Sequence, residues 1–212
     1  MSKNSIKYNY GTFIKINIAN LLLYLSLYTL LPVLPAILFS TTASFTIQNS
    51  ALLLLYFIGG IIIAGPFLFY IQDTFQRKSI ALFSYLGISI TALLFTWIEY
   101  PFTPLLLIAY GILYTLATSI NTTIAIEVSP SDKRSPANKI ASWSSRLGFL
   151  LGILLCCFLF PTQSNNSLIY ASIGLSLAGF LLLLTIKLQF RAPLGSSLFH
   201  LDPFYYQGAG RS

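Results

Sequence analysis

Charged residues are scarce in this sequence. Of its 212 residues, 8% are Asp, Glu, Lys or Arg, whereas 56% are hydrophobic. A soluble domain carries about a quarter of its residues as these four charged types, because they cover a surface that faces water. So few charges exclude a soluble globular protein, a disordered chain and a nucleic-acid module. The composition therefore predicts an integral membrane protein.

Histidine and cysteine are also nearly absent. The single histidine, His200, lies close to the C-terminus, and Cys156 and Cys157 are adjacent in an apolar run. Adjacent cysteines make neither a disulfide framework nor a metal site, so we expect them to pack as small apolar side chains. Without histidine in any apolar run, an intramembrane serine protease lacks its base and a zinc protease lacks its His-Glu-x-x-His ligands. We therefore expect no enzyme activity, no cofactor and no metal.

Six long apolar runs account for most of the chain. Each reaches the roughly 20 residues that a helix needs to cross a bilayer, and none alternates as the strands of a barrel do. The runs cover 14–39, 51–70, 79–98, 105–126, 140–160 and 168–188. The sequence thus predicts an all-α polytopic membrane protein with a cytoplasmic N-terminal tail at 1–13, a six-helix bundle at 14–188 and a cytoplasmic tail at 189–212.

The basic residues mark one side of this topology. Eleven of the twelve precede the first run, follow the sixth, or lie between the second and third or the fourth and fifth runs: Lys3, Lys7, Lys15, Arg77, Lys78, Lys133, Arg134, Lys139, Lys187, Arg191 and Arg211. Cytoplasmic loops are enriched in Lys and Arg, so both termini are predicted to be cytoplasmic. The net charge of +7 is therefore a sign of topology, and we expect no nucleic-acid partner.

The twelfth basic residue, Arg146, lies inside the fifth run. Ionisable groups at membrane depth are costly and often functional. Two interpretations are open for it. Its long side chain reaches the cytoplasmic headgroups, or it faces a water-filled cavity and attracts an anionic substrate or an acidic partner.

Small residues at helical spacing predict close helix packing. Gly60 and Ala64 in the second run, and Gly148 and Gly152 in the fifth, are each four residues apart, as are Gly174 and Ala178 in the sixth. Such pairs let two helix backbones approach in a membrane.

Polar side chains also lie on helical faces inside the runs. Asn17, Asn20, Tyr24 and Tyr28 share one face of the first run, and Asn121 belongs to a polar patch in the fourth, with Ser119, Thr122 and Thr123. These side chains either form hydrogen bonds between helices or line a polar pathway for a small-molecule substrate.

The segment from Phe69 to Lys78 resembles the loop signature of the major facilitator superfamily, G-x-L-x-D-x-x-G-R-R/K. Asp73, Arg77 and Lys78 match it, whereas Phe69 and Gln76 stand where glycine is usual.

Three further segments are similar to the same family. The Leu-Pro-Val-Leu-Pro close of the first run resembles the end of the family's first helix, and the stretch from Glu127 to Ala137 resembles its loop after the fourth helix. Gly148 and Gly152 lie where the antiporter branch has Gly-x-x-x-Gly-Pro, with Ile153 in place of the proline.

The resemblance implies a fold and a mechanism. Family members have two six-helix halves, each made of two inverted three-helix repeats, and this chain is similar to the N-terminal half, with 189–212 resembling the start of the interdomain linker. The implied activity is secondary transport of a small solute by alternating access. The implied gating cluster contains Asp73, Arg77, Lys78, Glu127 and Arg134, and the implied location is the inner membrane of a bacterium.

Alternating access requires a second six-helix half, which a second copy of the chain or a separate chain would supply. The alternative hypothesis is a truncated membrane fragment or an interaction subunit that does not transport. The sequence does not indicate the substrate.

Overall fold

The chain folds as a bundle of long helices in the computed structural model, which describes residues 10–32, 34–35, 47–97, 102–129, 134–159 and 165–186. No strand occurs among these residues. The helices are α1 (Tyr10–Leu30), α3 (Ile47–Thr74), α4 (Arg77–Leu94), α5 (Thr103–Val128), α6 (Arg134–Leu159) and α7 (Asn165–Leu184). Each of the six is long and apolar enough to cross a membrane. The prediction of an all-α polytopic membrane protein is confirmed.

Helix α1 is displaced from its predicted span of 14–39. It begins at Tyr10, inside the predicted tail, and ends at Leu30. Proline lacks an amide hydrogen and disfavours helical geometry in the residue before it, so Pro32 ends the regular helix early. Of the predicted tails, residues 1–9 and 189–212 lie outside the described residues.

Helices α3 and α4 are joined by only Phe75 and Gln76. Gln76 occupies a position where the family signature has glycine, yet its φ of −62° and ψ of 122° are ordinary extended values. Any residue with a side chain adopts this conformation without strain. The tight connection therefore forms without the glycine.

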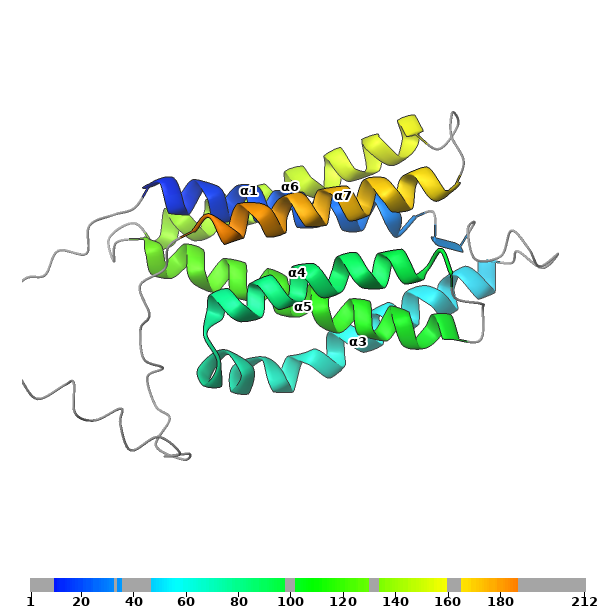
Figure 1. Ribbon diagram of the computed structural model, residues 1–212, viewed down its shortest axis with the longest axis horizontal. Helices are drawn as coiled ribbons and strands as arrows, with labels where there is room; N and C mark the ends of the chain where they lie inside the picture. Colours follow the sequence, from blue (N-terminus) through cyan, green and yellow to red (C-terminus); the bar gives the residue numbers. More distant parts are fainter. Residues whose placement is uncertain are drawn as a thin grey trace, which may run out of the picture.

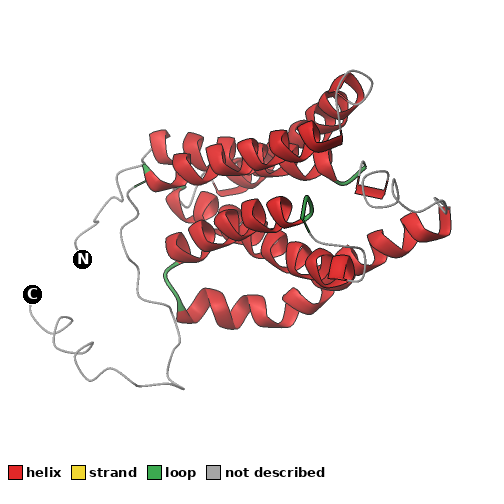
Figure 2. Ribbon diagram, turned by 45° about the vertical axis from the view of Figure 1, so that its right-hand side comes forward, coloured by secondary structure: helices red, strands yellow, loops and turns green. Residues whose placement is uncertain are grey.

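The helices run alternately in opposite directions (Figure 1). The first residues of α1, α4 and α6 therefore meet the last residues of α3, α5 and α7 at one end of the bundle, here named the Arg77 end. Helices α1, α6 and α7 form one group, and α3, α4 and α5 form another (Figures 1 and 2). Basic residues described near the Arg77 end are Lys15, Arg77, Lys78, Arg134 and Lys139.

The helix contacts repeat with an internal symmetry. The most extensive contacts join α3 to α5 and α1 to α6, followed by α1 with α7, α4 with α5 and α4 with α7. Exchanging the first three helices with the last three, in order, maps this set of pairs onto itself. Two inverted three-helix repeats have this property.

Glycines stand at the two most extensive helix contacts. A methyl group at Gly60 would collide with the Ile108 carbonyl of α5, and one at Gly148 would lie 2.6 Å from Tyr24 Cβ of α1. One turn further along α6, a methyl group at Gly152 would lie 2.8 Å from Tyr28 Cβ. Ala64, the small partner of Gly60, is buried. The three glycines thus lie where two helix backbones approach closely, whereas the packing predicted at Gly174 is wrong, because a methyl group there would have no described atom within 4 Å.

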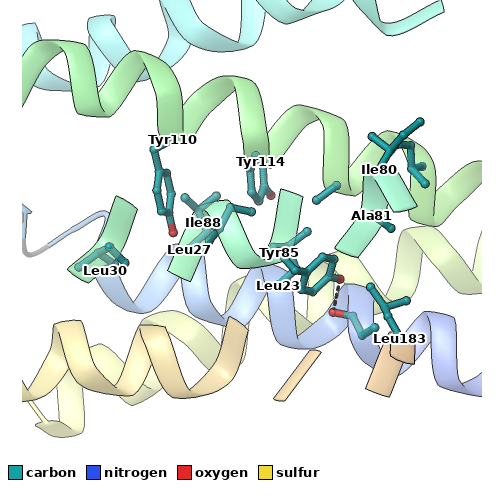
Figure 3. Packing of buried hydrophobic residues seen from close by; sticks show 14 of the residues in the cluster. Leu23, Leu27, Leu30, Ile80, Ala81, Tyr85, Ile88, Tyr110, Tyr114 and Leu183 are labelled. Carbon is teal, nitrogen blue, oxygen red and sulfur yellow. Dashed lines mark hydrogen bonds between the residues drawn. The ribbon is translucent and has the colours of Figure 1, made fainter. Parts of the chain in front are cut away.

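The apolar core lies mainly between α1, α4 and α5. Leu23 and Leu27 of α1, Tyr85 and Ile88 of α4, and Tyr110 of α5 are fully buried there (Figure 3). Serine pairs attach α7 to this core: the hydroxyls of Ser26 and Ser172 are 2.8 Å apart, and those of Ser89 and Ser176 are 2.7 Å apart. Interhelical hydrogen bonds of this kind stabilise helix association where lipid offers no hydrophobic drive.

Gly60→Ala tests the contact between α3 and α5. The added methyl group meets the Ile108 backbone, which cannot move without shifting α5, so we expect a loss of about 1–3 kcal/mol of stability. The neighbouring Gly59 has nothing within 4 Å, so Gly59→Ala is the matched control and should be neutral or stabilising. Thermal unfolding in detergent measures both, and equal midpoints would contradict the assignment.

Candidate functional site

An ion pair joins two helices at the Arg77 end. Arg77, the first residue of α4, pairs with Glu127 in the last turn of α5, and both side chains are about one third exposed or less. A cation at a helix N-terminus and an anion at a C-terminus each oppose the dipole of their own helix. Pairing places each charge beside the favourable end of the other helix. The structure thus joins two residues of the predicted gating cluster.

Lys78 has a different partner. Its ammonium donates to the carbonyls of Leu184, at 3.1 Å, and Ile186, at 2.6 Å, at the end of α7. Lys15 of α1 donates to Thr185 Oγ1 at 3.0 Å. The last carbonyls of a helix lack intrahelical donors, and cations are favourable there. The two lysines therefore hold the end of α7 against α1 and α4.

Two members of the predicted gating cluster remain, Asp73 and Arg134. Asp73 lies in the last turn of α3, but its side chain is outside the described part of the structure. Arg134 is the first residue of α6; its side chain is exposed and forms no ion pair with a described residue.

The polar stripe predicted on α1 divides into two parts. Asn17 is buried and donates to the Phe13 carbonyl of its own helix at 2.9 Å. Asn20 is buried and donates across to α6, to Ser144 Oγ at 3.1 Å and Ser145 Oγ at 3.4 Å. Tyr24 and Tyr28 are only partly buried. The two asparagines thus form hydrogen bonds inside the bundle, whereas the two tyrosine side chains are partly exposed.

A buried polar node connects four helices. The Asn121 amide of α5 donates to Tyr85 OH of α4 at 2.6 Å and, at 3.5 Å, approaches Asn20 Oδ1 of α1. The Tyr85 hydroxyl donates to the Ala19 carbonyl of α1 at 2.8 Å (Figure 3). With the bonds of Asn20 to α6, this node joins α1, α4, α5 and α6. Asn121 Oδ1 is buried and has no partner among the described atoms.

Aromatic rings continue from the stripe. Tyr24 and Tyr28 stack at a centroid distance of 6.4 Å, Tyr24 meets Tyr114 of α5 edge-on at 5.6 Å, and Tyr28 meets Phe149 of α6 edge-on at 4.6 Å. Edge-on and offset rings attract beyond the area that they bury. This group of Tyr24, Tyr28, Tyr114 and Phe149 is named the aromatic cluster; it joins α1, α5 and α6.

Arg146 lies near the middle of α6 with an exposed side chain. Its guanidinium carbon is 5.8 Å from the ring centroid of Trp143, within range of a cation–π interaction. It forms no ion pair with a described residue. Among the residues that the structure describes, no group of three or more metal-ligating side chains occurs.

Sequence reasoning missed Tyr85, Ser144, Lys15 and Tyr114. A single tyrosine in an apolar run has no local signal that separates a polar node from ordinary core. Ser144 did carry a signal, because it lies one turn before the predicted packing glycine Gly148 and so on the same face of α6.

Tyr85→Phe tests the polar node. The change removes one donor and one acceptor and leaves the Asn121 amide short of a partner in the core, so we expect about 1–2 kcal/mol of destabilisation. Tyr170→Phe, at an exposed site on α7, is the control and should have little effect. Unfolding midpoints in detergent that are the same for both variants would refute a role for the node.

Lys78→Gln tests the attachment of α7. We expect faster hydrogen exchange at the last turn of α7, because the carbonyls of Leu184 and Ile186 lose a charged donor. Lys78→Arg keeps the charge and should retain most of the protection. Unchanged exchange in Lys78→Gln would mean that the lysine does not hold this end.

The whole chain was compared with known proteins. The sequence model of the Major Facilitator Superfamily matches residues 16–198, which include all six helices except the first turns of α1. No curated protein matches the sequence. The match covers most of the chain, and the six apolar helices correspond to the N-terminal half of the family fold. The chain is an integral membrane protein that belongs to the Major Facilitator Superfamily.

Proposed function

We propose that the chain moves a small solute across a membrane as a secondary transporter of the major facilitator type. The observation that carries this proposal is the ion pair between Arg77 and Glu127. It links the loop after α3, where the family signature lies, to the end of α5, and so places a charged contact at the Arg77 end of a six-helix unit. A charged contact at the mouth of a transporter half is suited to holding one gate.

The proposal requires a second six-helix unit. Alternating access rocks one half against the other around a site at mid-membrane. Helices α3 and α6 carry many of the exposed apolar side chains, among them Leu55, Ile62 and Phe158. These helices flank α1 and α5, and we infer that a second half, from another copy or from further polypeptide, packs along them.

The Arg77 end is inferred to face the cytoplasm. The basic residues described there, together with those in the tails, follow the distribution of cytoplasmic loops. For a bacterial protein this orientation implies the inner membrane, with both termini in the cytoplasm.

Transport is tested with the protein in liposomes, incubated in a defined mixture of ¹³C-labelled sugars, amino acids and organic acids. We expect at least one compound to accumulate over time, relative to protein-free liposomes, as measured by mass spectrometry. If none accumulates although the protein remains folded, the alternative of a non-transporting fragment or interaction subunit is supported.

The ion pair is tested by charge exchange. Arg77→Glu and Glu127→Arg alone leave two like charges together, and each should lower the initial rate of uptake by about ten-fold, equivalent to about 1.4 kcal/mol. The double exchange restores the attraction and should recover part of the rate. Additive losses in the double variant would show that the two residues do not act as a pair.

A further inference from the structure

One face of α6 carries exposed polar and cationic side chains. We name Ser135, Lys139, Ser142, Trp143 and Arg146 the α6 stripe. Their spacing of four, three, one and three residues places them on one side of the helix, and all five are exposed. Gly148 contacts α1 and lies about 200° around the axis from Arg146, so the stripe points away from α1.

The stripe is positively charged. No Asp or Glu occurs in α6, and neither Lys139 nor Arg146 forms an ion pair with a described residue. Glu127, the acid of the ion pair at the Arg77 end, is already bound by Arg77. Among the described residues, the Arg146 guanidinium interacts with the face of Trp143. Its N–H groups form no hydrogen bond there and remain available to a ligand. A cation on an indole is still able to bind an anion through these donors.

The stripe reaches into the membrane. The predicted fifth span starts at Ile140, and six residues of helix place Arg146 about 9 Å further along the axis, where the unbroken apolar part of α6 begins at Leu147. Beyond Arg146, the exposed residues are apolar: Leu150, Leu154 and Phe158. A charged guanidinium at this depth is costly unless water or an anion lies beside it.

The aromatic cluster begins one turn beyond Arg146. Phe149 is 45% exposed, and its ring meets Tyr28, which is itself partly open. A solute that pairs its charge with Arg146 would therefore find ring faces and edges beside its uncharged part. Aromatic side chains favour a planar ring at such a place.

We propose that the α6 stripe, with Phe149 and Tyr28, recognises a small organic anion that carries a planar ring. This inference rests on the proposed transport function and names its substrate class. The carboxylate binds at Arg146, and Lys139 attracts it from the Arg77 end. A lipid phosphate is the other source of such an anion, because Leu150 and Leu154 also follow Arg146, and added phosphatidylglycerol distinguishes the two.

Thiol labelling tests the proposal in the full-length chain in phosphatidylcholine liposomes. Ser142→Cys places a thiol between Lys139 and Arg146, and the native exposed Cys157, on the same face but in the apolar part, is the internal control. Thiols react as thiolates, which form in water and not in lipid, so Cys157 should react slowly. We expect a membrane-impermeant maleimide to modify the new thiol about ten-fold faster than Cys157.

The probe for the anion is 2-naphthoate, and neutral 2-naphthamide is its matched control. We expect 2-naphthoate, but not the amide, to slow labelling at position 142. Adding Arg146→Gln should remove this protection without changing the labelling rate. Arg146→Lys should retain part of it, because a lysine keeps the charge but not the planar donor fork.

Three results would overturn the inference. Slow labelling at position 142 would place the stripe in lipid. Fast labelling without protection by 2-naphthoate would leave a water-accessible path but exclude this substrate class. Slowing by added phosphatidylglycerol, with no further effect of 2-naphthoate, would assign the stripe to lipid headgroups. None of these results alters the uptake measurement, so the transport proposal stands or fails separately.

Discussion

The bundle depends on close backbone contact at positions where a helix has no side chain. Gly60 of α3 lies against the Ile108 carbonyl of α5, and Gly148 of α6 lies against the Leu21 carbonyl of α1. Lipid tails are as apolar as leucine, so close packing and hydrogen bonds replace hydrophobic burial as the force between helices. These two contacts are equivalent under exchange of the three-helix repeats. They also place α1 and α5 at the centre, where the polar node forms.

The polar node gives the centre a single arrangement. Asn20, Tyr85 and Asn121 come from three helices, and their hydrogen bonds form only when all three are in register. A slip of one helix would leave buried amide or hydroxyl groups unpaired, which is costly away from water. Together with the serine pairs of α7, the node joins five helices, and the Gly60 contact attaches α3 to α5. Under the proposed transport function, changes in access to a substrate occur between this unit and the second half.

Local signals in the sequence predicted much of this structure. The apolar runs gave six helices because length and hydropathy decide whether a segment spans a membrane. The spacing of Gly60 with Ala64 and of Gly148 with Gly152 located residues at close helix contacts. The first predicted span runs past Pro32 to residue 39, whereas the regular helix α1 ends at Leu30.

Contacts between residues that are far apart in the chain were not predictable from the sequence. Tyr85 bonds to Ala19 and Asn121, which are 66 and 36 residues away in the chain. The family resemblance grouped Lys78 with Arg77, yet the two adjacent side chains point to different helices, α7 and α5. The same resemblance placed Arg77 near Glu127, because both belong to motifs that the family brings to one end.

The two repeats share their contacts but not their chemistry. Helices α3 and α6 hold equivalent places, and each presents an exposed face. On α3 that face is apolar, with Leu55, Ile58 and Ile62, whereas the corresponding part of α6 carries Lys139 and Arg146. Packing alone does not require this difference, since the glycine contact on each helix lies on another face. Under the proposed transport function, cations on one repeat only would give a symmetric scaffold a single place to recognise its solute.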